Sequence, residues 1–385
     1  MYNFDDISDR YNTYSLKWDC DKNILPMWVA DMDFKVLPEI KEAIIRRSNI
    51  ESYGYSITPD EYFDAYKNFF LRNHDISYDK KDMMFSLGVV PSISSMVRSL
   101  TNIGDNVVIL TPVYNIFFNS IRNNHRVILE CPLDYNNYEY SINFLDLEDK
   151  LKDDNTTLLI FCNPHNPIGK IWEYDDLKKV VDLCNKYNVT IISDEIHCDI
   201  AKRKYTPIYK VEGSERNTVV CLSATKCFNM AGAQSSIVIC KNRELYRKVN
   251  RGLNTDEVAE GNFFGYEMTI EALNKGDLWL KEMNQYVNNN FDYLYKFLNE
   301  NFKDIVCIKR EALYLAWLDV SKITKDTVKF VNFIKNKTGL WISDGDQYGK
   351  TGVGFVRINL ATSFNNVKDG LNRFKKGIEL FKEEA

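Results

Sequence analysis

Short apolar runs recur through the first two thirds of the chain, separated by amphipathic stretches. The runs are MMFSL (83–87), NVVIL (106–110), RVILE (126–130), TLLIF (157–161), VTIIS (189–193), TVVCL (218–222) and SIVIC (236–240). Most are apolar on both faces and rich in β-branched residues, which is typical of buried parallel strands. An intervening stretch, 174–187, places Leu177, Val180 and Cys184 on one helical face. This alternation predicts an α/β fold, with a mostly parallel sheet covered by helices on both sides.

The pattern changes after about residue 265. A long helical stretch covers 277–302, followed by the strand-like YLAWLDV (314–320), a helix near 326–338, GFVRINL (354–360) and a final amphipathic helix from about Asn366. A helix over 37–47, with Pro38 at its start, joins this α+β module from the other end of the chain. We therefore predict a large domain over 48–276 and a smaller α+β domain built from 1–47 and 277–385.

Charge and hydropathy limit the classes of partner. The 385 residues include 49 Lys and Arg against 54 Asp and Glu, a net charge of −5. This balance does not favour nucleic acid, which is bound by basic surfaces. No apolar run reaches the roughly 18 residues of a membrane span. The acidic start MYNFDD does not resemble a secretory signal.

The cysteines indicate the cellular compartment of the protein, and the histidines indicate whether a metal site is expected. The nine cysteines are scattered, form no C-x-x-C pair and in several cases lie inside apolar runs. This predicts a cytoplasmic protein without a disulfide framework. The four histidines show no i, i+4 pairing, so no metal site is expected.

The strongest chemical signal is Lys226, in SATK directly after the run TVVCL. A lysine at the end of a buried strand is poorly solvated, and such amines can attack carbonyl groups. Asp194 ends another such run, where a carboxylate needs a cationic or N–H partner. A pyridinium nitrogen and a magnesium ion are both candidates for that partner.

Three weaker signals follow other strands at the same predicted edge. Asn166 lies in the rigid turn NPHNPIG, Tyr114 lies in TPVY, and Gly88 precedes a helix whose N-terminal N–H groups can hold an anion. Each alone is better explained as a loop or core residue. Together, the five segments offer an amine, a carboxylate, an amide, an aromatic face and a phosphate cradle. That set is complementary to pyridoxal 5'-phosphate (PLP).

At this point the chain resembles the fold-type I PLP enzymes of the aspartate aminotransferase superfamily, and more narrowly the MalY/PatB-type cystathionine β-lyases. The resemblance covers nearly the whole chain. It rests on LPMWVADMDF (25–34), YGYS (53–56), TPVY, NPHNPIGK, SDEIHCD (193–199), SATKCFNMAG (223–232), YLAWLD and FVRIN (355–359).

The resemblance implies a role for each motif residue. Lys226 resembles the lysine that binds PLP covalently and transfers the substrate proton, and Asp194 the partner of the pyridine nitrogen. Tyr114 resembles the aromatic residue stacked on the ring, so these three are the expected catalytic residues. Asn166 is similar to the donor to the O3' oxygen, with His197 nearby.

The remaining contacts implied by the resemblance concern the phosphate, the partner subunit and the substrate. Ser223 and the backbone N–H groups of Val89 and Val90 resemble a phosphate cradle. Tyr55 is similar to a tyrosine that reaches the phosphate of a neighbouring subunit, which implies a homodimer with shared active sites. Arg357 resembles the arginine that binds the substrate α-carboxylate.

The expected reaction is cleavage of L-cystathionine or a related L-cysteine S-conjugate to a thiol, pyruvate and ammonia. A PLP-dependent aminotransferase is the alternative, because the two share every cofactor contact. Gln234, where many aminotransferases carry a phosphate-binding arginine, and His197, where they usually carry tyrosine, favour the lyase. A regulatory protein that retains the fold is also possible. A nicotinamide dehydrogenase is disfavoured, because the glycine cluster 349–354 precedes a strand instead of linking a strand to a helix.

Overall fold

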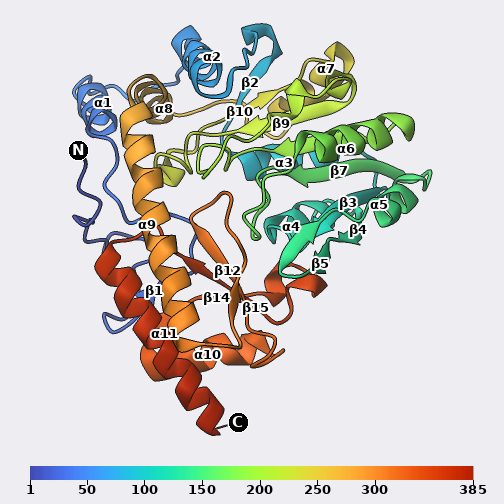
Figure 1. Cartoon of the computed structure of the whole chain (residues 1–385). Coiled ribbons are helices and arrows are strands. Elements are labelled where there is room, and N and C mark those ends of the chain that lie inside the picture. Colours follow the sequence, from blue (N-terminus) through green and yellow to red (C-terminus); the bar gives the residue numbers. More distant parts are fainter. Residues whose placement is uncertain (385) are drawn as a thin grey trace.

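A seven-stranded sheet forms the centre of the computed structural model, which describes residues 1–384 (Figure 1). Its strands, in order across the sheet, are β2 (Met83–Ser86), β10 (Ser236–Ile239), β9 (Thr218–Leu222), β8 (Thr190–Asp194), β7 (Thr156–Cys162), β3 (Asn106–Thr111) and β4 (Val127–Pro132). Strand β10 runs antiparallel to both neighbours, while the other pairs are parallel. The predicted α/β class with a mostly parallel sheet is confirmed.

Helices cover both faces of this sheet, which explains the unbroken apolar runs. Val107 and Ile109 point to one face, where they pack with α3 (Val89–Leu100), α4 (Ile116–Arg122) and α7 (Arg243–Thr255). The alternate residues, Val108 and Leu110, belong to the core on the opposite face. Helices α2 (Asp60–His74), α5 (Phe144–Leu151) and α6 (Tyr174–Lys186) contribute to that core. Because both faces of the sheet are buried, polar and apolar residues do not alternate along these strands. Edge strand β4 is partly exposed.

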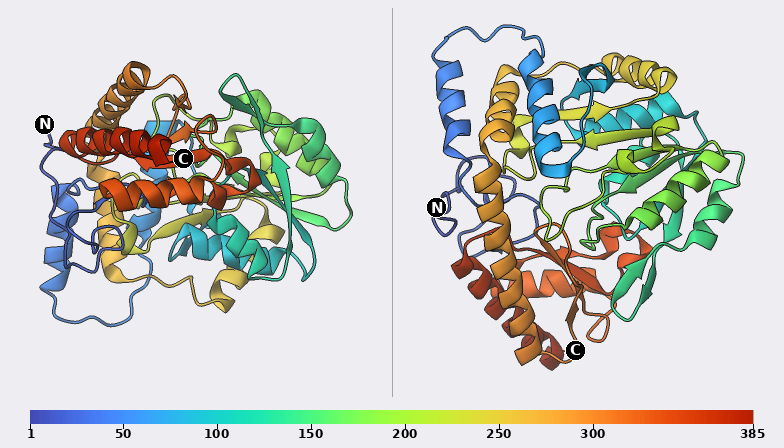
Figure 2. Two further views of the ribbon diagram at one scale, coloured as in Figure 1. Left: turned by 90° about the horizontal axis from the view of Figure 1, so that it is seen from below. Right: turned by 45° about the horizontal axis from the view of Figure 1, so that its top comes forward.

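A second, four-stranded antiparallel sheet lies towards the C-terminal end of the chain. Its order is β11 (Val306–Cys307), β12 (Leu315–Asp319), β15 (Phe355–Asn359) and β14 (Ser343–Asp344). Helices α10 (Thr327–Thr338) and α11 (Phe364–Glu384) lie side by side next to it (Figure 2). The two sheets agree with the predicted large and small parts, but the boundaries 48–276 and 277–385 remain a prediction.

The remaining helices link these parts. Helix α1 (Pro38–Ser48) packs beside α8 (Phe263–Lys275), and the long α9 (Asp277–Asn301) extends from there to α11 (Figure 1). A small ladder of β5 (Asp134–Asn136) and β6 (Glu139–Ser141) follows β4. Within residues 1–384, no helix combines the length and apolar character needed to cross a membrane.

Distant segments of the chain meet at the second sheet. Strand β1 (Leu25–Pro26) pairs in parallel with β13 (Leu340–Trp341). Just after β1, the side-chain amide of Asn359 donates hydrogen bonds of 2.6 Å to the carbonyl oxygens of Val29 and Asp31. Residues 25–31 are therefore held against the C-terminal part of the molecule.

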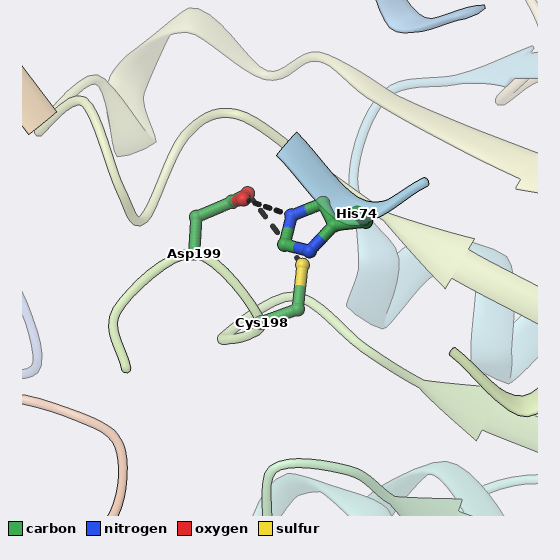
Figure 3. Close-up of side chains that lie close together, drawn as sticks. All are labelled: His74, Cys198 and Asp199. Carbon is green, nitrogen blue, oxygen red and sulfur yellow. Dashed lines mark hydrogen bonds and ion pairs between the residues drawn. The ribbon is translucent and has the colours of Figure 1, made fainter. Parts of the chain in front are cut away.

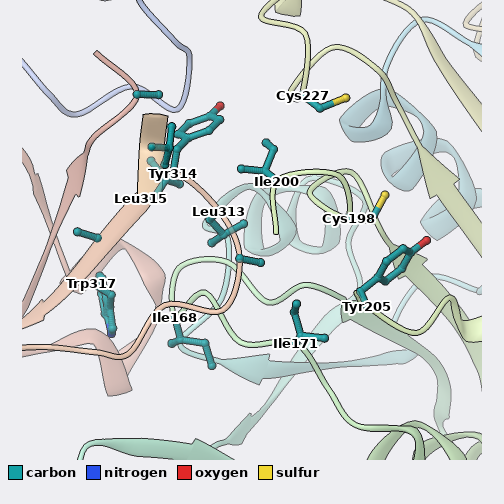
Figure 4. Packing of buried hydrophobic residues seen from close by; sticks show 14 of the residues in the cluster. Ile168, Ile171, Cys198, Ile200, Tyr205, Cys227, Leu313, Tyr314, Leu315 and Trp317 are labelled. Atoms are coloured by element: carbon teal, nitrogen blue, oxygen red, sulfur yellow. The ribbon is translucent and has the colours of Figure 1, made fainter. Parts of the chain in front are cut away.

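The loop after β7 joins the two sheets at Gly169. The Gly169 carbonyl accepts the N–H groups of Glu311 and Ala312, each at 2.9 Å. Gly169 has φ +69°, and a Cβ atom there would lie 2.9 Å from the Ala312 oxygen, so this position requires glycine. Figure 4 shows Ile168, Ile200 and Leu313 among the buried side chains that fill the junction.

Candidate active site

The carboxyl ends of β3, β7, β8 and β9 border a cavity of about 260 Å³. It is lined by Ala30, Leu87, Gly88, Val89, Val90, Pro91, Tyr114, Cys162, Asn166, Asp194, Ile196, His197, Thr225, Lys226, Ala231, Gln234 and Ser235. Ligands of open α/β sheets bind at this edge. The structure thus brings together nine of the residues that the sequence analysis singled out: Gly88, Val89, Val90, Tyr114, Asn166, Asp194, His197, Lys226 and Gln234.

Lys226 follows β9 and points its amine into this cavity. Its Nζ donates a 2.7 Å hydrogen bond to the carbonyl oxygen of Ala30. Burial lowers the pKa of Lys226 to about 8, although the charges of Asp31 and Asp194 act in the opposite direction. A substantial fraction of the amine is therefore neutral and nucleophilic slightly above neutral pH.

The turn that carries Lys226 is fixed by hydroxyl groups. The Ser223 hydroxyl donates to the carbonyl oxygen of Ser235 at 2.7 Å, and the Thr225 hydroxyl lies 2.7 Å from Ser223 Oγ. The backbone N–H of Thr225 also donates to Ser223 Oγ at 3.1 Å. Thr225 and Ser235 line the cavity, and Ser223 is hydrogen-bonded to both of them.

Asp194, the last residue of β8, offers a buried carboxylate to the cavity. One oxygen accepts the N–H of Ile196 at 3.1 Å, and no ion pair within the described residues involves this side chain. Burial raises the pKa of Asp194 to about 7, against the lowering effects of the Ile196 hydrogen bond and the Lys226 charge. A cationic ligand group in the cavity would restore its ionised form.

His197 is buried in the loop that follows β8. Burial, and then the charges of Lys226 and Arg357, hold its pKa well below the usual value, so the ring is neutral. Its Nδ1 atom has no hydrogen-bond partner within the described chain. The ring therefore has one nitrogen available to a ligand.

Arg357 reaches the cavity region from β15 of the second sheet. Its guanidinium group donates to Asn166 Oδ1 at 3.3 Å and to the Trp28 carbonyl oxygen at 3.1 Å, and lies 5.0 Å from the ring centroid of Tyr348. Arg357 is buried and forms no ion pair with a carboxylate of residues 1–384. A buried, unpaired guanidinium is suited to bidentate binding of a ligand carboxylate.

Tyr114 and the start of α3 form two further walls. The Tyr114 ring packs edge-on against Phe117, with a centroid separation of 5.8 Å, and burial raises the pKa of its phenol to about 12. Helix α3 begins at Val89, after Gly88, which has no side chain to cap the helix. The first N–H groups of α3 are therefore available to an anion.

Tyr55, unlike the other predicted residues, is exposed at the surface, and it does not line the cavity. It is fully exposed and borders a separate hollow together with Tyr53 and Phe263. Conversely, sequence reasoning missed Ala30, Thr225 and Ser235 as cavity residues. Ala30 and Thr225 lie inside the motifs 25–34 and 223–232, whereas nothing in the sequence marked Ser235.

Comparison with known proteins agrees with this geometry. The sequence matches the family described as aminotransferase class I and II over residues 22–374. The chain belongs to this family. Cystathionine beta-lyase PatB of Bacillus subtilis (strain 168) is 35% identical over 385 residues, covering 98% of this chain and 100% of the relative.

Solved structures show the same overall similarity. A PLP-bound protein of Clostridium difficile 630, provisionally named an aminotransferase, superposes with a TM-score of 0.94 at 36% identity, covering 98% of this chain and 100% of that one. The PLP-bound C–S lyase of Staphylococcus hominis gives a TM-score of 0.93 at 30% identity, with 98% of both chains covered. The fold is therefore that of the fold-type I PLP-dependent enzymes.

Proposed function

We propose that this protein is a PLP-dependent carbon–sulfur β-lyase. Its substrate is L-cystathionine or a related L-cysteine S-conjugate, which reacts with water to give a thiol, pyruvate and ammonia. The observation that carries the proposal is a buried amine of lowered pKa, Lys226, in one cavity with the unpaired carboxylate of Asp194.

The donor set of the cavity fits PLP. Asp194 lacks a cationic partner within the described chain, which suits a protonated ring nitrogen, and Lys226 suits the aldehyde carbon. The uncapped start of α3 at Val89 and Val90, together with Thr225 of the same cavity lining, suits the phosphate. Asn166 and Tyr114 complete the set as a donor to the O3' oxygen and a wall against the ring.

When bound, PLP supplies an electron sink that makes the α-proton acidic and allows the β-thiolate to leave. The residues of the chain control the rest of the reaction. Arg357 binds and orients the substrate carboxylate, which fixes the direction of the Cα–H bond. The neutral Lys226 amine accepts the α-proton, and its hydrogen bond to Ala30 holds it within the cavity.

Two observations support the lyase over the aminotransferase. PatB and the Staphylococcus hominis protein are named for carbon–sulfur cleavage. In addition, Gln234 lines the cavity at the position where many aminotransferases have an arginine. The aminotransferase remains the second candidate, favoured by the name given to the Clostridium difficile protein.

The two reactions are separated by their products. Purified holoenzyme is incubated with L-cystathionine, and separately with L-alanine or an aromatic amino acid plus 2-oxoglutarate. We expect pyruvate and thiol in the first assay, at a kcat/KM well above that for glutamate formation in the second. Lys226→Ala is the control and should lower turnover by roughly 10³-fold or more. A higher kcat/KM for transamination would replace the lyase with the second candidate.

We further propose a cytoplasmic homodimer with shared active sites, in which Tyr55 contacts the phosphate bound by the partner subunit. The exposed position of Tyr55, outside the cavity of its own chain, supports this arrangement. All nine cysteines lie in the described part of the chain as free thiols, which supports a reducing compartment.

A further inference from the structure

A second group of reactive side chains lies beside the active-site loop, outside the cavity described above. His74, at the end of α2, meets Cys198 and Asp199 from the loop after β8 (Figure 3). His74 Nε2 is 2.6 Å from one Asp199 oxygen, and the Cys198 thiol is 3.5 Å from the other. None of these three side chains has a role in the proposed lyase reaction.

The three donor atoms have the spacing of a metal site. One nitrogen, one sulfur and one oxygen all lie within 4.8 Å of one another. In a tetrahedral zinc site, bond lengths near 2.0–2.3 Å place the ligand atoms roughly 3.3–3.7 Å apart. The separation of the Cys198 sulfur from an Asp199 oxygen, 3.5 Å, already falls in this range, and the hydrogen-bonded His74–Asp199 pair, at 2.6 Å, must move apart.

The group is also accessible from solvent. It borders a cavity of about 420 Å³, and the side chains of His74 and Asp199 are 9% and 6% exposed. Asn284 lines the same cavity, and its Oδ1 atom has no hydrogen-bond partner within the described residues. That oxygen, or a water molecule, is available for a fourth position.

The charges around the opening set the expected strength of binding. Lys202, Lys204 and Lys281 line the cavity, but all three are exposed to solvent, where salt screens their charge. Cys198 is buried, His74 and Asp199 are partly buried, and the three donor atoms lie close together. The lysines therefore weaken the attraction of a cation without blocking its approach.

We propose that His74, Cys198 and Asp199 bind one zinc ion. A thiolate, an imidazole and a carboxylate form a donor set that suits Zn²⁺ and disfavours Mg²⁺ and Ca²⁺, which prefer oxygen ligands. On binding, the Cys198 thiol loses its proton to solvent, and the metal replaces the His74–Asp199 hydrogen bond. The histidine spacing predicted no metal site, because His74 is far from the other two ligands along the chain.

The site would hold the active-site loop in place. Cys198 directly follows His197, which lines the proposed PLP cavity. Zinc therefore ties α2 to the loop that carries His197. Since the ion binds the folded protein only, it is expected to raise the Tm of the holoenzyme.

The test measures metal on the holoenzyme. Protein is incubated with Zn²⁺ or Co²⁺ and freed of excess metal, and bound metal is counted by elemental analysis. The visible bands of Co²⁺ and its thiolate charge-transfer band are recorded as difference spectra. We expect one ion per chain, a tetrahedral Co²⁺ spectrum and loss of both in Cys198→Ser and His74→Gln. Two matched controls are expected to retain the ion: Cys184→Ser, a buried thiol in α6, and His125→Asn, an exposed histidine.

Several results would overturn the proposal. They are wild-type protein that retains no stoichiometric metal, a Co²⁺ spectrum without thiolate bands, and equal retention by wild type and both site variants. If the variants do not fold, zinc K-edge absorption of the wild-type protein decides the matter. One sulfur ligand beside nitrogen and oxygen supports the site, and a set without sulfur overturns it.

Discussion

At the residue scale, burial sets the protonation states of the groups that line the cavity. The pKa of Lys226 falls to about 8, that of Asp194 rises to about 7, and that of His197 falls well below its usual value. Each shift disfavours charge in a place that water does not reach well. A bound cofactor with complementary charge removes this penalty. The empty cavity therefore destabilises the folded protein, and the bound cofactor stabilises it.

Asp194→Asn tests whether the carboxylate that the reaction needs lowers the stability of the cofactor-free protein. The folded-state pKa of about 7 lies above the ordinary value of 3.8. The folded state therefore binds the proton more tightly, and the free energy of unfolding falls as pH rises from about 4 to 7. Removing the carboxyl group should raise the Tm of the cofactor-free protein at pH 8, by about 2 °C or more. Turnover of the holoenzyme should fall by at least about 10²-fold, because the charge beside the ring nitrogen is lost.

Calorimetry at pH 5 and pH 8, combined with steady-state assays, checks both effects. The gain in Tm should be larger at pH 8 than at pH 5. The exposed Asp175, changed to Asn, is the matched control and should alter neither quantity. Unchanged turnover in Asp194→Asn would show that this carboxylate serves only the fold.

At the scale of elements, the loops after the strands do two tasks at once. The segment after β7 carries Asn166 to the cavity and, three residues later, uses the Gly169 carbonyl to bind the N–H groups of Glu311 and Ala312. The same segment therefore positions a cofactor contact and fixes the second sheet, from which Arg357 extends. A change at Gly169, the joint between the two sheets, is expected to affect both the position of Asn166 and that of Arg357.

Gly169→Ala should disturb this joint by two mechanisms. A residue other than glycine at φ +69° costs roughly 1–3 kcal/mol, and the new Cβ atom must push away the Ala312 oxygen at 2.9 Å. We expect a lower Tm together with a higher KM, because the backbone that places Asn166 and Arg357 shifts. Gly104→Ala is the control, since φ is +89° there and nothing lies within 4 Å of the added atom. An equal loss of Tm in both variants, with KM unchanged, would contradict the role of Gly169 as a joint.

The sequence predicted the strands of the large sheet well, because burial on both faces leaves a continuous apolar signal. It also predicted most of the cavity, because parallel strands bring their ends to one edge. It could not predict that β10 runs antiparallel to its neighbours, because the apolar pattern of a buried strand does not depend on its direction in the sheet. Nor could it find the Ala30 carbonyl or the pairing of His74 with Asp199, because both depend on contacts between distant segments.

At the scale of the whole molecule, the cavity lies where the two sheets meet, and one proposed contact comes from another chain. Tyr55 is fully exposed in a segment that also exposes Tyr53 and Ile57. Large apolar side chains grouped on a surface are typical of a binding interface. In a homodimer with twofold symmetry, each chain would give this segment to the other.

Mixing two inactive variants tests the shared site. Lys226→Ala and Tyr55→Ala homodimers should each have low activity. After subunit exchange, half of the sites in each mixed dimer would have both residues intact, so activity should return. Exchange is followed independently with differently tagged subunits, and the recovered activity is compared with the number of mixed dimers, each of which should contain one intact site. Exchange without recovery would mean that each site is completed within one chain.

The pairing of β1 with β13 has a consequence for synthesis of the chain on the ribosome. Residues 25–31 leave the ribosome early, yet their partners Leu340, Trp341 and Asn359 are among the last to be made. Until then, the segment around Ala30, whose carbonyl accepts the Lys226 amine, lacks its pairing with β13 and its hydrogen bonds to Asn359, and has only earlier contacts such as those of Asn229 and Tyr314. The large sheet can form while translation continues, but the full set of contacts that positions the amine is complete only when translation is almost finished. A nascent chain stalled before β13 should therefore contain a formed sheet and an unfinished catalytic centre.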